Sequence, residues 1–290
     1  MQKVKKAVIP VAGYGTRFLP FTKALPKSML PVVNVPAVQL VVQEAIDSGI
    51  EEIILIVGQH KDIIKNHFSS AEELEKVLEK RGSYDYLDKV VYPQKMANIH
   101  YVVQNEQIGT ANAVLLAEEF IGNQPFAVMF GDDVISSEVP VLKQLIEIFE
   151  RENKTVIGVQ KVGYENIAKY AACEFSKVNG RLYELTSLVE KPDPKNAKSD
   201  IAPLGRYVLA ENFFKNIHTL TPGIHGEYQL TDAIAKEING GGLLAYEFEG
   251  RRFDMGDVFG FLQANVEFSL KNPELSDKMK EYLKNLVKKF

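Results

Sequence analysis

The sequence predicts an α/β fold in which helices sandwich a mixed, mostly parallel sheet. Four apolar runs rich in Val and Ile, at 7–11, 53–57, 100–104 and 126–130, have the length of buried strands. Stretches with apolar residues at helical spacing separate them, which is the order of elements expected of a parallel sheet. Such sheets bind ligands beyond the carboxyl ends of their strands, so motifs that follow these runs should share one crevice.

Helices are expected between these strands. Residues 37–48 follow Pro36, which suits the start of a helix, and they stop at Gly49. Residues 112–120 lie between glycines and form a second helical segment. The charged stretch 69–97 has apolar residues at helical spacing. It is interpreted as a solvated helix and loop, with a role in closing the site as the alternative.

The character of the chain changes at about residue 164. Two apolar runs, 172–178 and 182–189, flank the turn dipeptide Asn179-Gly180 and predict a β-hairpin. A helix at 229–238 and a strand at 243–248 then return the chain to the sheet, and helices at 258–290 complete the fold.

Composition limits the class of protein. The chain has 290 residues, 46% of them hydrophobic, and a net charge of −4, so it can bury a substantial core and is not expected to bind nucleic acid. No stretch has the uninterrupted apolar length of a membrane span, and a cytoplasmic location is expected. Cys173 is the only cysteine, which excludes an internal disulfide, and it is interpreted as a packing residue.

The most informative motif follows the first expected strand. Gly13 and Gly15 lack the Cβ atoms that would keep a backbone away from phosphates, and a loop after a strand can direct N–H groups at phosphate oxygens. Arg17, Lys23 and Lys27 add three spaced cations. Together these features predict a site for a nucleoside triphosphate.

Two other glycine-rich phosphate loops do not fit. A P-loop needs Gly-Lys-Ser or Gly-Lys-Thr, whereas Thr16 and Arg17 follow Gly15. The dinucleotide fingerprint needs a third glycine where this chain has Phe18. The sequence therefore disfavours both ATPase or GTPase chemistry of the P-loop design and hydride transfer.

A pair of carboxylates indicates a metal ion. Asp132 and Asp133 follow the apolar run 126–130, and because successive strand side chains point to opposite faces, one of them can face a bound ion. Hard oxygen ligands suit Mg²⁺, which takes one or two carboxylates together with phosphate oxygens and water. Magnesium is therefore the expected cofactor.

The glycine loop resembles that of the sugar-phosphate nucleotidyltransferases, and in particular of their bacterial uridylyltransferase group. The resemblance rests on Ala12-Gly13-x-Gly15-Thr16-Arg17-x-Leu19-Pro20, on Lys23 and on Pro26-Lys27-x-Met29-Leu30-Pro31, and it continues to about Ala264. It implies a Rossmann-like (GT-A-like) nucleotidyltransferase fold with a nucleotidyltransferase domain at 1–265. Within this domain the nucleotide-binding part covers about 1–163 and the sugar-binding part about 164–250, and a C-terminal helical tail follows at 266–290.

The resemblance also implies a reaction, the transfer of a uridylyl group from UTP to glucose 1-phosphate. The sugar phosphate would attack the α-phosphorus in line, giving UDP-glucose and pyrophosphate. A thymidylyl- or cytidylyltransferase acting on a sugar 1-phosphate stays open, as does a non-catalytic nucleotide-sugar-binding protein on the same fold. The tail predicts an amphipathic helix that either folds back or pairs with another subunit, and relatives commonly form homodimers or homotetramers.

The resemblance further assigns roles to residues of this sequence. The catalytic residues are Arg17, Lys27 and Lys191. The nucleotide-binding residues are Ala12, Gly13, Gly15, Thr16, Gln104, Gly109 and Asp132. The sugar-binding residues are Ala171, Glu190, Lys191 and Gly205. The metal ligands are Asp132 and Asp254, with Asp257 as the alternative to Asp254.

The chain departs from the usual uridylyltransferase pattern at three places. It has Gly109-Thr110-Ala111-Asn112-Ala113 in place of Gly-Leu-Gly-His-Ala, Ala171 in place of a glycine, and Ser28 in place of a glutamate. Gln104 can both donate and accept hydrogen bonds and so match a uracil edge. The first departure leaves the choice of base open, whereas the reaction type is unaffected.

Overall fold

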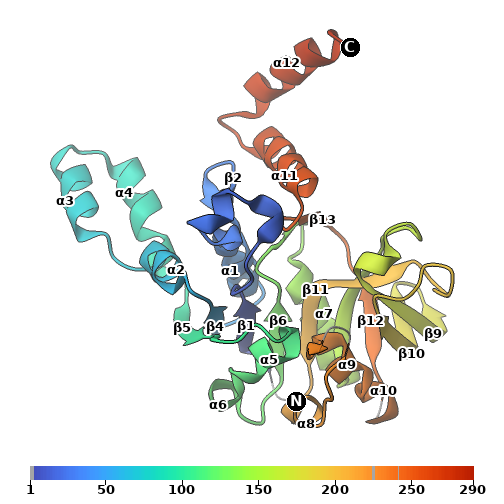
Figure 1. The fold of residues 1–290 in the computed structure, drawn as a ribbon. Coiled ribbons are helices and arrows are strands. Elements are labelled where there is room, and N and C mark those ends of the chain that lie inside the picture. The colour runs from blue at the N-terminus through green and yellow to red at the C-terminus, as the bar shows by residue number, and fades with distance from the viewer. Residues whose placement is uncertain (1–2, 224–225, 241) are drawn as a thin grey trace.

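The computed structural model describes residues 3–223, 226–240 and 242–290, and this part of the chain forms a nine-stranded sheet between helices (Figure 1). The strand order is β5 (Asn98–Val103), β4 (Glu52–Val57), β1 (Lys6–Pro10), β6 (Phe126–Met129), β11 (Ile201–Leu209), β8 (Val156–Lys161), β12 (Leu244–Glu247), β10 (Leu182–Glu190) and β9 (Ala171–Asn179). Within this sheet β11 and β10 are antiparallel to the other strands. The expected mixed, mostly parallel sheet is confirmed.

Helices cover both faces of the sheet. One buried cluster lies under α1 (Ala37–Asp47) and α7 (Val141–Glu152), and a second lies under α5 (Thr110–Leu115), α8 (Phe214–His218) and α9 (Leu230–Ala235). The other helices are α2 (Lys61–His67), α3 (Glu72–Lys80), α4 (Tyr84–Val91), α6 (Glu118–Ile121), α10 (Glu237–Gly240), α11 (Val258–Lys271) and α12 (Ser276–Val287).

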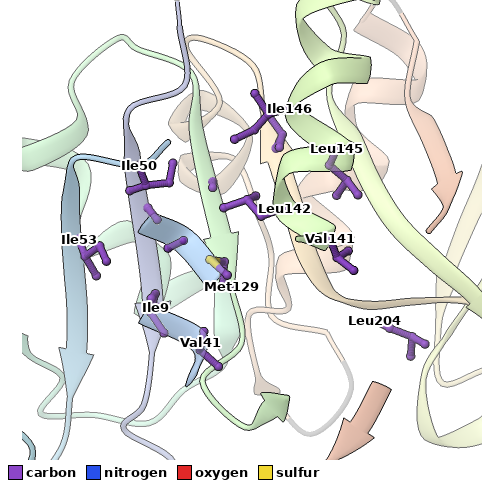
Figure 2. Packing of buried hydrophobic residues seen from close by; sticks show 14 of the residues in the cluster. Ile9, Val41, Ile50, Ile53, Met129, Val141, Leu142, Leu145, Ile146 and Leu204 are labelled. Carbon is purple, nitrogen blue, oxygen red and sulfur yellow. The ribbon is translucent and has the colours of Figure 1, made fainter. Parts of the chain in front are cut away.

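The two-residue repeat of the strands divides the core between these faces. Ile9 of β1 belongs to the cluster under α1 and α7, whereas the adjacent Val8 belongs to the opposite cluster. Figure 2 shows the first cluster, which gathers Ile9 and Met129 of the sheet with Val41 of α1 and Leu142 of α7. Because β1 is buried on both faces, its sequence reads as a continuous apolar run.

Two predicted helices differ from the structure. The prediction of a single helix at 112–120 is wrong, because this segment forms two helices, α5 and α6. The Ala117 N–H donates to the Val114 carbonyl oxygen at 3.0 Å. This bond spans three residues, as in a 3₁₀ turn, and it tightens the chain between the two helices. The helix expected at 229–238 is likewise divided into α9 and α10.

Two small ribbons and four helices extend the central layers. β2 (Pro31–Val32) pairs with β3 (Val35–Pro36), and β7 (Asp133–Ser136) pairs with β13 (Arg251–Asp254). The β7–β13 ribbon packs with α11 in a third buried cluster. α3 and α4 project together from the body, and α12 extends away from it (Figure 1). In the described part of the chain, no helix has the length and apolar character needed to cross a membrane.

Candidate active site

The glycine loop leads from the carboxyl end of β1 into three 3₁₀ turns, η1 (Thr16–Phe18), η2 (Phe21–Lys23) and η3 (Lys27–Met29). Gly15 has a φ of 64°, in the left-handed region, and a Cβ at this position would lie 2.9 Å from Thr22 Cγ2 and 3.0 Å from Lys27 Cβ. Phe18 packs edge-on against Phe261 of α11, with ring centroids 5.9 Å apart. The loop therefore folds back beside Lys27 and is attached to α11.

Lys27 links the glycine loop to Asp132. Its Cε lies 3.5 Å from the place that a Cβ on Gly13 would occupy, and its Nζ forms an ion pair with Asp132 Oδ2. Burial alone would raise the pKa of Asp132, but the Lys27 ammonium and Arg252 hold this pKa below its ordinary value. Asp132 is therefore ionised at neutral pH.

The β7–β13 ribbon brings Asp254 to the same place. Its register sets Asp254 opposite Asp133, and the Met255 N–H donates to the Asp132 carbonyl oxygen at 2.8 Å. The ribbon thus joins two segments of the site that lie far apart in the sequence.

Three predicted site residues converge beside Gly256. A Cβ on Gly256 would lie 2.9 Å from Arg17 Nη2, 2.9 Å from Asp254 Oδ1 and 3.1 Å from Asp132 Oδ2. A larger residue would fill the space between these groups. Glycine therefore leaves room in which the two carboxylates can share a cation, next to an exposed guanidinium.

This pair of carboxylates fits a magnesium ion. Among the residues that the structure describes, no group of three or more His, Cys, Asp or Glu side chains is suited to hold a metal. Mg²⁺ needs only one or two carboxylates when phosphate oxygens and water complete its shell, so Asp132 and Asp254 suffice. The Asp257 carboxylate accepts from the Gly260 N–H at 3.0 Å and caps α11, so it already has a structural role.

Asp133 has different partners from Asp132. It is buried, and its Oδ1 accepts from Arg252 Nε at 2.5 Å, while Arg252 Nη1 donates to the Tyr170 hydroxyl at 3.1 Å. Burial raises the pKa of Asp133 to about 6, even though Arg252 acts in the opposite direction. Gly205 has a φ of 65°, and a Cβ there would lie 2.1 Å from Asp133 Oδ2. Gly205 therefore makes room for this carboxylate.

A cavity of about 360 Å³ adjoins the glycine loop and Asp132. The predicted residues in its lining are Ala12, Gly13, Lys27, Gln104, Gly109 and Asp132. Gly109 has a φ of 117°, and a Cβ there would lie 2.2 Å from the Tyr228 carbonyl oxygen, so only glycine lets these two segments approach. Gly15 and Thr16 shape the loop from outside this lining.

Gln107 is a further residue of the cavity that was not predicted from the sequence. Its Nε2 donates to the Ala12 carbonyl oxygen at 2.6 Å, which ties the loop after β5 to the glycine loop. The signal for it was weak, because an amide in a polar loop is common and its partner lies near the N-terminus.

Of the predicted sugar-binding residues, Ala171 and Glu190 lie where β9 and β10 pair and Lys191 follows β10, whereas Gly205 lies on β11 beside Asp133. Glu190 lies opposite Ala171, which is buried, and Glu190 Oε2 accepts from Thr231 Oγ1 at 2.8 Å. Burial raises the pKa of Glu190, whereas Thr231 and Lys191 act to lower it. Lys191 has a φ of 44°, and its Nζ lies 3.9 Å from Glu190 Oε1. Glu227 lines the cavity, and its charge also raises the pKa of Glu190. The cavity and the predicted sugar-binding region therefore adjoin.

Arg206 belongs to the framework of the site. It is fully buried, and its Nε and Nη2 donate to Glu44 Oε1 at 3.0 Å and Oε2 at 2.7 Å. It also donates to the carbonyl oxygens of Phe130, Gly205 and Asp133. Arg206 thereby ties α1 to the turn between β6 and β7.

Cations and carboxylates that meet beside such a cavity, at the carboxyl ends of parallel strands, suit a reaction at the phosphates of a nucleotide. The fold and the site therefore define a nucleotidyltransferase. Residues 6–270 match the family model described as nucleotidyl transferase, and the chain belongs to this family.

Known relatives agree with this class. The chain is 46% identical over 286 residues to the UTP–glucose-1-phosphate uridylyltransferase of Staphylococcus epidermidis, covering 99% of both chains. Its identity to the UTP–glucose-1-phosphate uridylyltransferase 2 of Staphylococcus saprophyticus is also 46%, with the same coverage. The resemblance to the uridylyltransferase group is confirmed.

Solved structures agree on the fold. The UTP-bound UGPase from Acinetobacter baumannii superposes with a TM-score of 0.89 at 33% identity, over 97% of this chain and 98% of that chain. A UDP-glucose pyrophosphorylase complexed with UDP-glucose superposes with a TM-score of 0.83 at 33% identity, over 93% of this chain and 100% of that chain. The predicted nucleotidyltransferase fold is confirmed.

Proposed function

We propose that the protein transfers a uridylyl group from UTP to glucose 1-phosphate. The observation that carries the proposal is the convergence of Arg17, Asp132 and Asp254 beside Gly256, next to the cavity that Gln104 lines. Its Staphylococcus relatives, which the chain matches over 99% of their length, are named for this activity.

The reaction is a direct displacement. An oxygen of the sugar phosphate attacks the α-phosphorus of UTP, and the bond from that phosphorus to the oxygen bridging to the β-phosphate breaks. Pyrophosphate leaves with the electron pair, and UDP-glucose is formed. Arg17 and Lys27 stabilise the charge that develops on the α-phosphate and the leaving group. Lys27 suits this role because Asp132 holds its ammonium at the wall of the cavity.

Magnesium is part of the proposal, with Asp132 and Asp254 as its ligands. When bound, the ion neutralises phosphate charge and so assists departure of pyrophosphate. The low pKa of Asp132 favours this role because the carboxylate is ionised without a change of pH.

The sugar phosphate is assigned to Glu190 and Lys191. The half-exposed Lys191 ammonium would bind the phosphate as a point charge, and Glu190 would accept hydrogen bonds from sugar hydroxyls. Ala171 and Gly205 stay predicted sugar contacts, and their burial supports backbone rather than side-chain contacts.

A homodimer or homotetramer is proposed through α12. None of the residues of α12 is buried, and Tyr282 on its apolar face is 60% exposed. A second copy of this chain would cover that face. The cytoplasmic location stays a prediction.

The proposal is tested by a matrix of substrates. The protein with Mg²⁺ receives UTP, dTTP or CTP together with glucose 1-phosphate or another sugar 1-phosphate, and pyrophosphate release is measured. We expect UTP and glucose 1-phosphate to give the highest kcat/KM. Preference for dTTP would replace the assignment by a thymidylyltransferase, and nucleotide binding without pyrophosphate from any pair would leave a non-catalytic binding protein.

A matched pair of variants tests the metal ligands. Asp254→Asn should abolish most Mg²⁺-dependent turnover, because an amide is a weaker ligand for a hard cation. Asp257→Asn should retain turnover, because Asn also caps helices well. Equal losses in the two variants would contradict the choice of Asp254.

A further inference from the structure

Gln104 has its amide fixed by a residue of α5. Gln104 is buried at the cavity wall, and its Nε2 donates to Asn112 Oδ1 at 3.3 Å. An amide group carries its donor and its acceptor on opposite branches, so directing the nitrogen at Asn112 turns the carbonyl oxygen the other way. The bond therefore decides which branch of Gln104 is offered to a ligand in the cavity.

Asn112 can fix this orientation because the start of α5 is itself held. The Ala111 N–H donates to the Tyr228 carbonyl oxygen at 2.9 Å, and Thr110 Oγ1 accepts from the Leu230 N–H at 2.9 Å. The first turn of α5 is thus bonded to the neighbouring segment. These bonds lie in the stretch 109–113, where the chain departs from the usual uridylyltransferase pattern.

The orientation of this amide distinguishes one class of pyrimidine from another. Uracil and thymine carry an N3–H donor beside a carbonyl, whereas cytosine carries an N3 acceptor beside an amino group. A carbonyl oxygen of Gln104 pairs with the N3–H, but it would face the unprotonated N3 of cytosine. A rotated amide would suit cytosine instead, because its N–H donates to N3 and its oxygen accepts from the amino group.

We propose that Asn112 is a positioning residue for the choice of base. It holds the Gln104 carbonyl oxygen toward the base, so the site accepts nucleoside triphosphates with an N3–H donor and rejects CTP. The inference rests on the proposed function, because it takes this cavity as the base site. It narrows the three bases left open by the sequence to uracil and thymine.

The test measures the ratio of kcat/KM for UTP to kcat/KM for CTP, with glucose 1-phosphate as the second substrate. Asn112→Ala removes the acceptor and lets the amide of Gln104 rotate, so the ratio should fall by roughly 5- to 150-fold, the effect of one misplaced buried hydrogen bond. The Asp side chain in Asn112→Asp can only accept, so Gln104 keeps its orientation, and the ratio should stay within about threefold, below the lower limit for one such hydrogen bond.

Each outcome decides the inference. A partial loss of folding in Asn112→Ala lowers kcat/KM for UTP and for CTP by the same factor, so the ratio reports only the folded molecules, and an unchanged ratio overturns the proposal. A ratio that falls in Asn112→Asp as far as in Asn112→Ala would show that Asn112 donates to Gln104, which overturns it as well. If the parent releases no pyrophosphate from any pair, the proposed function fails instead. The same ratio is then read from equilibrium binding of UTP and CTP by calorimetry.

Discussion

Replacing Glu44 with Gln would leave a buried guanidinium charge without its carboxylate. Arg206 has no exposed side-chain surface, and the Glu44 side chain is 11% exposed, so water cannot replace the lost partner. The shape and one acceptor oxygen are retained in Gln, which isolates the effect of charge. We expect a large loss of stability, because breaking one partner of a buried ion pair is costly.

The magnitude follows from the size of the chain. Removal of one partner from a buried pair typically costs about 3–5 kcal/mol. With 290 residues, an unfolding entropy of about 2.1 cal/mol/K per residue gives about 0.6 kcal/mol/K for the whole chain. The melting temperature should therefore fall by about 5–8 °C. The three carbonyl oxygens that Arg206 also contacts favour the lower end of this range.

Scanning calorimetry of the parent and of Glu44→Gln measures the shift. The matched control is Glu51→Gln, which breaks an exposed pair with Lys5 whose two charged atoms lie 2.5 Å apart. An exposed pair contributes under about 1 kcal/mol, so the control should melt within about 2 °C of the parent. If Glu44→Gln melted as close to the parent as the control does, the argument from the buried charge would be refuted.

Four further predictions concern other parts of the chain. Arg17→Ala should lower kcat by about 10²–10³ with little change in melting temperature, because Arg17 is exposed; a matching loss of stability would contradict this role. Gly205→Ala should lower the melting temperature, because its Cβ would lie 2.1 Å from Asp133 Oδ2; an unchanged value in calorimetry would show that the site relaxes. Cys173 should resist thiol reagents at pH 8 until the protein is unfolded, because burial raises its pKa to about 12 and the thiolate is the reactive form; rapid labelling of the folded protein would contradict its packing role. Truncation after Pro273 should reduce the oligomer size in light scattering, and an unchanged size would exclude α12 as the interface.

The parallel part of the sheet could be predicted because its strands are buried on both faces. Strands such as β4 contain an uninterrupted apolar run of Ile, Leu and Val, which is a local pattern that the sequence shows directly. β11 is just as buried, but Pro203, Gly205 and Arg206 interrupt its sequence. Its antiparallel position between β6 and β8 depends on long-range pairing, which no local periodicity encodes.

The residues of the candidate site likewise divide into those that the local sequence predicts and those that depend on long-range pairing. Residues such as Gly13, Gln104 and Asp132 lie within three residues of the carboxyl end of a strand, so their common location could be predicted from strand ends alone. Arg252 could not, because its partner Asp133 lies in another segment and only the β7–β13 register brings the two together. The close approach of Gly205 to Asp133 could not be predicted either, because a glycine in the sequence does not reveal which atom occupies the space of the missing Cβ.

The pairing of β7 with β13 also sets when, during synthesis, the site can exist. Asp132 is translated first, and the strand that carries Asp254 follows only after β8, β9, β10, β11 and β12. An emerging chain can already contain β1, β4, β5 and β6, and with them the glycine loop. A copy terminated before β13 therefore lacks the second carboxylate, so the proposed chemistry needs β13 to have been made.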